Sequence, residues 1–173
     1  AAFDAIVELV REVAAAEILP GFRRLQDRAA VAKTSPVDVV TEYDQAAERR
    51  LTAGIAQILA DAAVLGEEAV AADPSTIRRM DANGTVVVVD PIDGTWNFAA
   101  GIAVFGVLIA VRQDHETVFG LLYDPVRDDW IRAEPGAGAW FCAPGAEAGR
   151  LATSAVPCHR GFVPHRFAAE DAF

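Results

Sequence analysis

One stretch near the middle of the chain constrains the fold more than any other. It begins with four consecutive valines, Val86 to Val89, and continues as Asp90-Pro91-Ile92-Asp93-Gly94-Thr95. Because β-branched residues favour strands, and a run without polar residues suits a strand covered on both faces, the valines predict a short buried strand. A buried strand has no need of carboxylates at its end, so the turn that follows is a candidate functional site.

This turn carries residue types that bind cations and anions. Asp90 and Asp93 are three positions apart on a stiff turn, where they can converge on one point and offer the hard oxygen ligands that suit Mg²⁺. Gly94 and Thr95 supply backbone N–H groups and a hydroxyl at which an anion could dock. The alternative is an ordinary connection between strands, since Pro, Asp and Gly are common turn residues.

The composition restricts the class of protein and its partners. The chain has 173 residues, one domain or a large part of a bigger protein, and 53% of them are hydrophobic, enough for a sizeable core. A formal net charge of −10 disfavours nucleic acid and anionic membranes as partners and favours cations. There is no apolar run of membrane-spanning length, no signal-peptide pattern and no disulfide framework from the two cysteines, so the expected compartment is the cytoplasm.

Apolar residues recur at helical spacing in two segments before the valine strand. The first segment begins near Phe3, and Pro20-Gly21 is expected to kink or end its helix. The second begins at Thr41, whose spacing from Asp44 is that of a capping box, so Asp44 has a purely structural role available. Glu48 falls on the outer side of this second helix, away from its apolar stripe.

The remaining segments predict loops and short strands. A polar break at 33–36 precedes a short strand or extended piece at 37–40, and 69–84 has the Pro, Asn and Gly content of a loop, with room for one helical turn. Strands with hairpin connections are expected at 86–89, 103–111, 118–123, 129–132 and 139–142, with 151–154 as a candidate edge strand. The predicted fold class is α+β, with two N-terminal helices packed on a largely antiparallel sheet of five or six strands.

Three acidic clusters follow the ends of these expected elements, and together they resemble the inositol monophosphatase family. They are Lys33-x-Ser35-Pro36-x-Asp38-x-Val40-Thr41-x-x-Asp44, Gly66-Glu67-Glu68, and Asp90-Pro91-Ile92-Asp93-Gly94-Thr95-x-Asn97-Phe98. This is a superfamily of Mg²⁺-dependent, lithium-sensitive phosphatases that includes fructose-bisphosphatases. The resemblance implies a metal-binding α+β domain at 1–155, the first layers of an αβαβα sandwich, and the start of its C-terminal part at 156–173.

The resemblance implies that Glu67, Asp90 and Asp93 bind the metal, with the carbonyl of Ile92 as a further ligand. This assignment is physically coherent, because carboxylates about 4 Å apart repel by roughly 4 kcal/mol per pair at an effective dielectric constant of 20. A cleft that gathers several acids therefore requires cations. Taken alone, Glu67-Glu68 has the alternative of a solvated loop.

The same resemblance implies how phosphate and water are held. Gly94 and Thr95 are expected to bind the phosphate through backbone N–H groups, with Lys33 near it on a loop. Thr95 and Asp44 are expected to orient or activate the attacking water, and Glu67 counts with them among the catalytic residues.

The expected function is Mg²⁺-dependent hydrolysis of a small phosphorylated alcohol such as inositol monophosphate, by a homodimer and without nucleic-acid or membrane partners. A histidinol-phosphate or sugar-phosphate phosphatase is the alternative within the class. The family's C-terminal Trp-Asp-x-x-Ala-Gly motif has no counterpart, since Trp130 follows Asp129 in the reverse order. We therefore expect these 173 residues alone to be inactive, and a non-catalytic Mg²⁺-binding or interaction module is the alternative of a different class.

Overall fold

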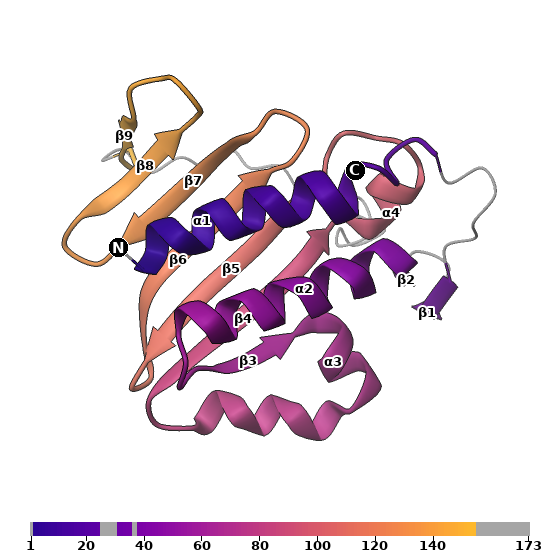
Figure 1. The fold of residues 1–173 in the computed structure, drawn as a ribbon, viewed down its shortest axis with the longest axis horizontal. Helices are drawn as coiled ribbons and strands as arrows, with labels where there is room; N and C mark the ends of the chain where they lie inside the picture. The colour runs from indigo at the N-terminus through magenta and orange to yellow at the C-terminus, as the bar shows by residue number, and fades with distance from the viewer. Residues whose placement is uncertain (1, 25–30, 36–37, 155–173) are drawn as a thin grey trace, which may run out of the picture.

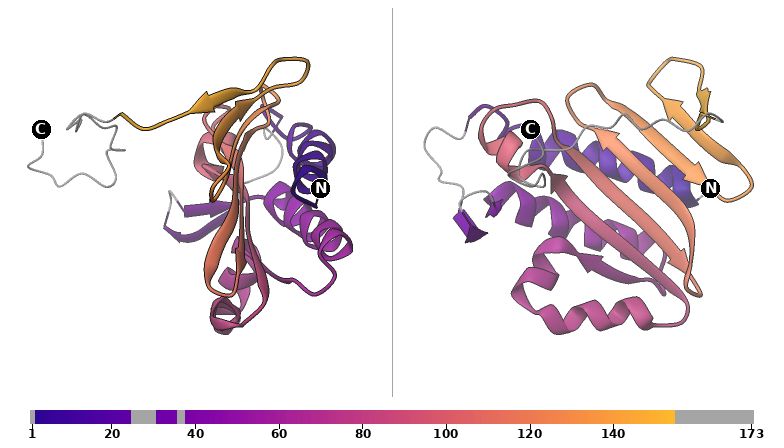
Figure 2. Two further views of the ribbon diagram at one scale, coloured as in Figure 1. Left: turned by 90° about the vertical axis from the view of Figure 1, so that its left-hand side faces the viewer. Right: turned by 180° about the vertical axis from the view of Figure 1, so that it is seen from behind.

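Two long helices lie side by side on one face of a seven-stranded sheet (Figure 1). The computed structural model describes residues 2–24, 31–35 and 38–154. Figure 2 shows the sheet edge-on, with both helices on the same side of it. The α+β fold class expected from the sequence is confirmed.

The strands follow one another across the sheet in the order of the chain. They are β3 (Ala63–Gly66), β4 (Thr85–Asp93), β5 (Gly106–Gln113), β6 (Glu116–Asp124), β7 (Asp129–Glu134), β8 (Gly138–Cys142) and β9 (Gly149–Leu151). The β3–β4 pair is parallel, and each of the other neighbouring pairs is antiparallel. The sequence predicted five or six strands, and the additional one is β3, whose apolar run was too short to identify on its own.

The two long helices begin and end close to the expected positions. Helix α1 (Ala2–Val13) continues as the π-helical turn η1 (Ala14–Ile18), which ends just before Pro20. Helix α2 (Glu42–Ile58) is capped by Thr41, which forms the predicted capping box with Asp44. Among the described residues, no helix combines the length and apolar character needed to cross a membrane.

Two segments differ from the sequence-based expectation. The polar break at 33–36 is partly strand, because β1 (Val31–Ser35) pairs with β2 (Asp38–Val40) in a separate antiparallel ribbon. The expected loop at 69–84 is largely helical, with α3 (Glu67–Ala72) and the 3₁₀-helix η3 (Pro74–Asp81). Local capping explains η3, since the Ser75 N–H donates to Asp73 Oδ1 at 2.9 Å and Pro74 occupies a position that suits proline.

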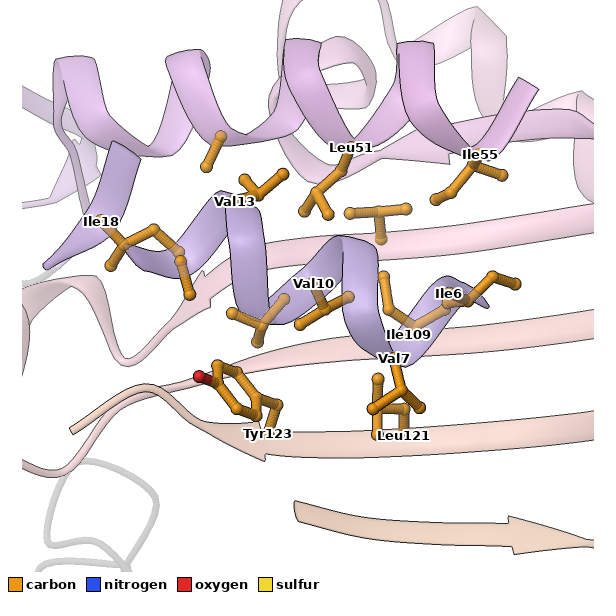
Figure 3. Packing of buried hydrophobic residues seen from close by; sticks show 14 of the residues in the cluster. Ile6, Val7, Val10, Val13, Ile18, Leu51, Ile55, Ile109, Leu121 and Tyr123 are labelled. Atoms are coloured by element: carbon orange, nitrogen blue, oxygen red, sulfur yellow. The ribbon is translucent and has the colours of Figure 1, made fainter. Parts of the chain in front are cut away.

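The hydrophobic core lies between the two helices and the sheet (Figure 3). Alternate residues of β5 and β6, including Ile109 and Leu121, point towards α1 and α2 and are buried. The helices contribute Val10 and Leu51 to the same layer. Full burial of one such side chain stabilises the fold by about 1.5–3 kcal/mol. The face of the sheet opposite the helices is more exposed. Leu122, which lies between two buried residues of β6, remains 52% exposed there.

Candidate active site

Strand β3 ends at Gly66 beside the middle of the parallel strand β4, and this pairing brings two acidic residues together. Gly66 pairs with Val89, so Glu67 and Asp90 are the next residues along the two strands. The Glu67 and Asp90 side chains share a hydrogen bond. The fold thereby joins two of the three acidic clusters identified in the sequence.

Asp90 occupies surroundings that disfavour its negative charge. Its pKa rises from the usual 3.8 to about 8, first because the side chain is largely buried, then because of the negative charge of Glu67, the hydrogen bond with it, and the negative charge of Asp93. The Ile92 N–H donates to Asp90 Oδ1 at 3.1 Å and partly opposes this rise. In the absence of a cation the cluster therefore retains a proton, which a bound cation would displace.

Asp93 lies at the exposed end of β4, past an irregularity in the β4–β5 register between Asp90 and Asp93. No three His, Cys, Asp or Glu side chains within the described ranges are already gathered as metal ligands. The donor chemistry nevertheless fits Mg²⁺, because Glu67, Asp90 and Asp93 offer only oxygens.

Asp44 is fully buried at the start of α2 and is surrounded by donors. Its Oδ2 accepts from the Thr41 N–H at 2.8 Å and from the Thr41 hydroxyl, and its Oδ1 accepts from the Thr95 hydroxyl at 3.1 Å. Burial raises the pKa of Asp44, and the hydrogen bonds from Thr41 and Thr95 oppose the rise. The capping role and the contact with the candidate site therefore coexist in one carboxylate.

The turn after β4 connects this carboxylate to the acidic cluster. The Thr95 hydroxyl lies 2.9 Å from the Ile92 carbonyl oxygen and 3.1 Å from Asp44 Oδ1, and its single proton can point to either. Gly94 has a φ of 91°, and a Cβ there would lie 2.9 Å from the Val104 carbonyl oxygen, so a side chain is excluded on two grounds. The five-residue helix α4 (Thr95–Ala99) follows and buries Phe98.

Lys33 is the predicted phosphate neighbour, and its backbone belongs to β1. Its side chain lies outside the part of the chain that the structure describes. The proposed contact of Lys33 with phosphate therefore stays a prediction, whereas the structure brings Asp44, Thr95, Asp90 and Glu67 into one connected group.

The position expected for Glu48 from the sequence pattern was wrong. This residue was expected on the outer side of α2, but it is 7% exposed and its carboxylate accepts from the Glu68 N–H at 2.6 Å and the Ala69 N–H at 2.9 Å. Burial raises the pKa of Glu48, and these two hydrogen bonds oppose that rise. The available signal was its spacing, because residues four apart on a helix share a face and Glu48 is four positions after Asp44.

Comparison with known proteins identifies the family to which the chain is similar. Residues 2–166 match the inositol monophosphatase family. A Thermotoga maritima protein named fructose-1,6-bisphosphatase/inositol-1-monophosphatase is 30% identical over 109 residues, which are 63% of this chain and 39% of the relative.

Solved structures agree in fold. A Thermotoga maritima IMPase is 27% identical and superposes with a TM-score of 0.71 over 88% of this chain and 54% of that chain. The Staphylococcus aureus inositol monophosphatase II with inositol monophosphate bound is 27% identical, with a TM-score of 0.57 over 78% of this chain and 44% of that chain. The chain thus spans between about two fifths and just over half the length of these relatives. With its site residues arranged as described and the family match extending over most of its length, the chain belongs to the inositol monophosphatase family.

Proposed function

We propose that this chain provides the metal- and phosphate-binding part of a Mg²⁺-dependent phosphomonoesterase. The observation that carries the proposal is the placement of Glu67 beside Asp90, directly after the paired residues Gly66 and Val89, with Asp93 three positions further along β4. Burial and these acidic neighbours raise the pKa of Asp90 to about 8. A cation placed among these oxygens would relieve that repulsion. We further propose that this cation is Mg²⁺ and that the Ile92 carbonyl is an additional ligand.

Each residue of the proposed site has a distinct task. Glu67, Asp90 and Asp93 hold the metal, which when bound neutralises phosphate charge and lowers the pKa of water. Gly94 and Thr95 present backbone N–H groups to the phosphate. The Thr95 hydroxyl accepts a hydrogen bond from the attacking water and passes its own proton towards Asp44, with which it is already hydrogen-bonded at 3.1 Å.

Inositol monophosphate is the substrate we propose, because it occupies a related Staphylococcus aureus enzyme and the proposed N–H groups recognise phosphate in any alcohol ester. A sugar phosphate is the alternative that the name of the Thermotoga maritima relative favours. Histidinol phosphate is a further one. We also propose a cytoplasmic homodimer whose partners are small phosphate esters, with neither nucleic acid nor membrane among them.

The direct test is release of inorganic phosphate from inositol monophosphate at saturating Mg²⁺. It should be run on the 173 residues and on any longer product of the same gene, because the relatives are longer and we expect little turnover from the 173 residues alone. Asp90→Asn is nearly isosteric and removes one ligand charge, so it should lower turnover at least about 100-fold, the range over which one charge-stabilising group acts. Asp61→Asn, at an exposed position between α2 and β3, is the matched control.

Near wild-type turnover of Asp90→Asn would contradict the site assignment. Mg²⁺ binding without turnover in the longest product would support the other alternative, a non-catalytic metal-binding module. If the longest product is active, its turnover of a panel of phosphate esters, including a hexose phosphate and histidinol phosphate, would separate the substrate alternatives.

A further inference from the structure

The first turn of α3 lacks a cap from its own sequence. Gly66 precedes the helix and has no side chain to accept hydrogen bonds from its first N–H groups. The carboxylate of Glu48, 20 residues earlier on α2, takes this place through Oε2 to the Glu68 N–H at 2.6 Å and Oε1 to the Ala69 N–H at 2.9 Å. A negative group at a helix start also interacts favourably with the partial positive charge there.

Gly66 and Glu48 form a sterically matched pair. A Cβ on Gly66 would lie 2.1 Å from Cδ of Glu48, a distance at which the carboxylate would have to move away. The φ of Gly66 is −95°, which other residues readily adopt. The glycine is therefore required for the space that the Glu48 carboxylate occupies, and not for an unusual backbone conformation.

Glu67 lies between the two parts of this contact. Gly66 on one side packs against the Glu48 carboxylate, and Glu68 on the other donates its N–H to it. The backbone of Glu67 is thus held from both sides while its side chain meets Asp90. Helix α2 lies beside α3 (Figure 1), and one turn earlier it carries Asp44, which contacts Thr95.

From this geometry we propose that Glu48 is a positioning residue, which fixes the start of α3 so that Glu67 faces Asp90 and binds Mg²⁺. The inference rests on the proposed function, since it requires Glu67 to be a metal ligand. Helix α2 then sets the spacing between two parts of the site, with Asp44 supporting the water-activating threonine and Glu48 supporting the metal ligand. Glu48 itself touches neither substrate nor metal.

The first test is Mg²⁺ affinity of the 173-residue chain, measured by isothermal titration calorimetry with MgCl₂. In Glu48→Gln one oxygen still accepts, but the amide NH₂ faces the second N–H, so Mg²⁺ should bind about 10–100-fold more weakly, the usual effect of losing a residue that supports a metal ligand. The melting temperature without metal should fall much less than the affinity. Glu12→Gln, at an exposed position of α1, is the control and should bind like the wild type.

A double-mutant cycle separates positioning from general destabilisation. Gly66→Ala changes no charge but displaces the Glu48 carboxylate, so it should weaken Mg²⁺ binding by a similar factor. In the background of Glu48→Ala the carboxylate is absent, and Gly66→Ala should then have almost no further effect. Fully additive losses of Mg²⁺ affinity from Gly66→Ala and Glu48→Ala would overturn the inference. If the Glu48 variants fold poorly, Gly66→Ala still tests it, because a wild-type Mg²⁺ affinity in that variant would also overturn the inference.

The outcomes separate the role of Glu48 from the proposed metal-binding function. Wild-type Mg²⁺ affinity in Glu48→Gln, together with loss of binding in Asp90→Asn, would overturn the role of Glu48 and leave the proposed function intact. No Mg²⁺ binding by the wild-type chain would overturn both. In a product with phosphatase activity, Glu48→Gln should raise the half-saturating Mg²⁺ concentration while retaining most of kcat at saturating Mg²⁺.

Discussion

Asp44 is fully buried and Asp90 is partly buried, and both contribute to the candidate site, yet their surroundings are opposite. Both oxygens of Asp44 accept hydrogen bonds from threonines or from the start of α2. Asp90 accepts one hydrogen bond from the Ile92 N–H and otherwise faces the acids Glu67 and Asp93. Asp44 has donors to both of its oxygens, whereas no positively charged side chain of the described residues is found beside Asp90. This contrast separates a carboxylate that orients neighbours from one that recruits a cation.

The largest effect on stability is expected from Asp44→Ala. The change leaves the buried Thr41 N–H and hydroxyl without the acceptor that Asp44 provides, and each orphaned buried group costs about 1–3 kcal/mol. The Thr95 hydroxyl can still donate to the Ile92 carbonyl oxygen. We expect a loss of about 3 kcal/mol or more in the free energy of unfolding, measured by urea denaturation without metal. A loss below about 1 kcal/mol would show that Asp44 is not the structurally engaged carboxylate described above.

Mg²⁺ bound by Asp90 and its acidic neighbours should stabilise the native state by a similar amount. Binding to the native state alone adds about 2.7 kcal/mol at a concentration of 100 Kd. The melting temperature of the wild type should therefore rise with Mg²⁺, and that of the Glu67→Gln/Asp90→Asn double variant should rise much less. Equal rises in both proteins would place the cation elsewhere in the molecule.

Thr95→Val tests the connection between the two groups. The substitution keeps the shape of the side chain but removes the hydroxyl that contacts both Asp44 Oδ1 and the Ile92 carbonyl. A cost of about 1 kcal/mol in unfolding free energy is expected for the lost hydrogen bond, with Mg²⁺ affinity less affected than phosphate release. Phosphate release at the wild-type rate would remove Thr95 from the proposed water-activating role.

The smallest effect on stability is expected from Asp90→Asn without metal. Unlike Asp44→Ala and Thr95→Val, this substitution should not destabilise the protein. Because the pKa of Asp90 is raised to about 8, the wild type without metal must take up a proton there on folding near neutral pH, whereas asparagine needs none. The free energy of unfolding in EDTA should therefore stay equal or increase by about 1 kcal/mol. The same urea titration that reports on Asp44→Ala measures it. A clear destabilisation would mean that Asp90 supports the fold as Asp44 does, and the distinction between the two carboxylates would fail.

The parts of this architecture that depend on local pattern could be predicted from the sequence. The valine strand and the capping box of Thr41 with Asp44 each involve residues within a few positions of one another. The turn expected at Asp90 to Asp93 is instead a continuation of β4, with an irregular register between these two residues. The contact of Thr95 with Asp44 followed only from the family resemblance, because these residues are 51 positions apart. The hydrogen bonds of Glu48 could not be predicted either, since its partners lie 20 and 21 positions away, although its spacing from Asp44 indicated that the two residues share a face of α2.

The consecutive order of the strands has a consequence for how the chain folds during synthesis. Strands β4 to β9 are joined to their neighbours in sequence, so the sheet can assemble from contacts that are short along the chain. Helix α1 precedes the sheet along the chain, yet Arg11 pairs with Asp128 and Arg132 with Asp4, across 117 and 128 positions. The apolar side of α1 must therefore wait until β6 and β7 have left the ribosome. During that interval it is a surface on which chaperones can act and at which nascent chains can aggregate.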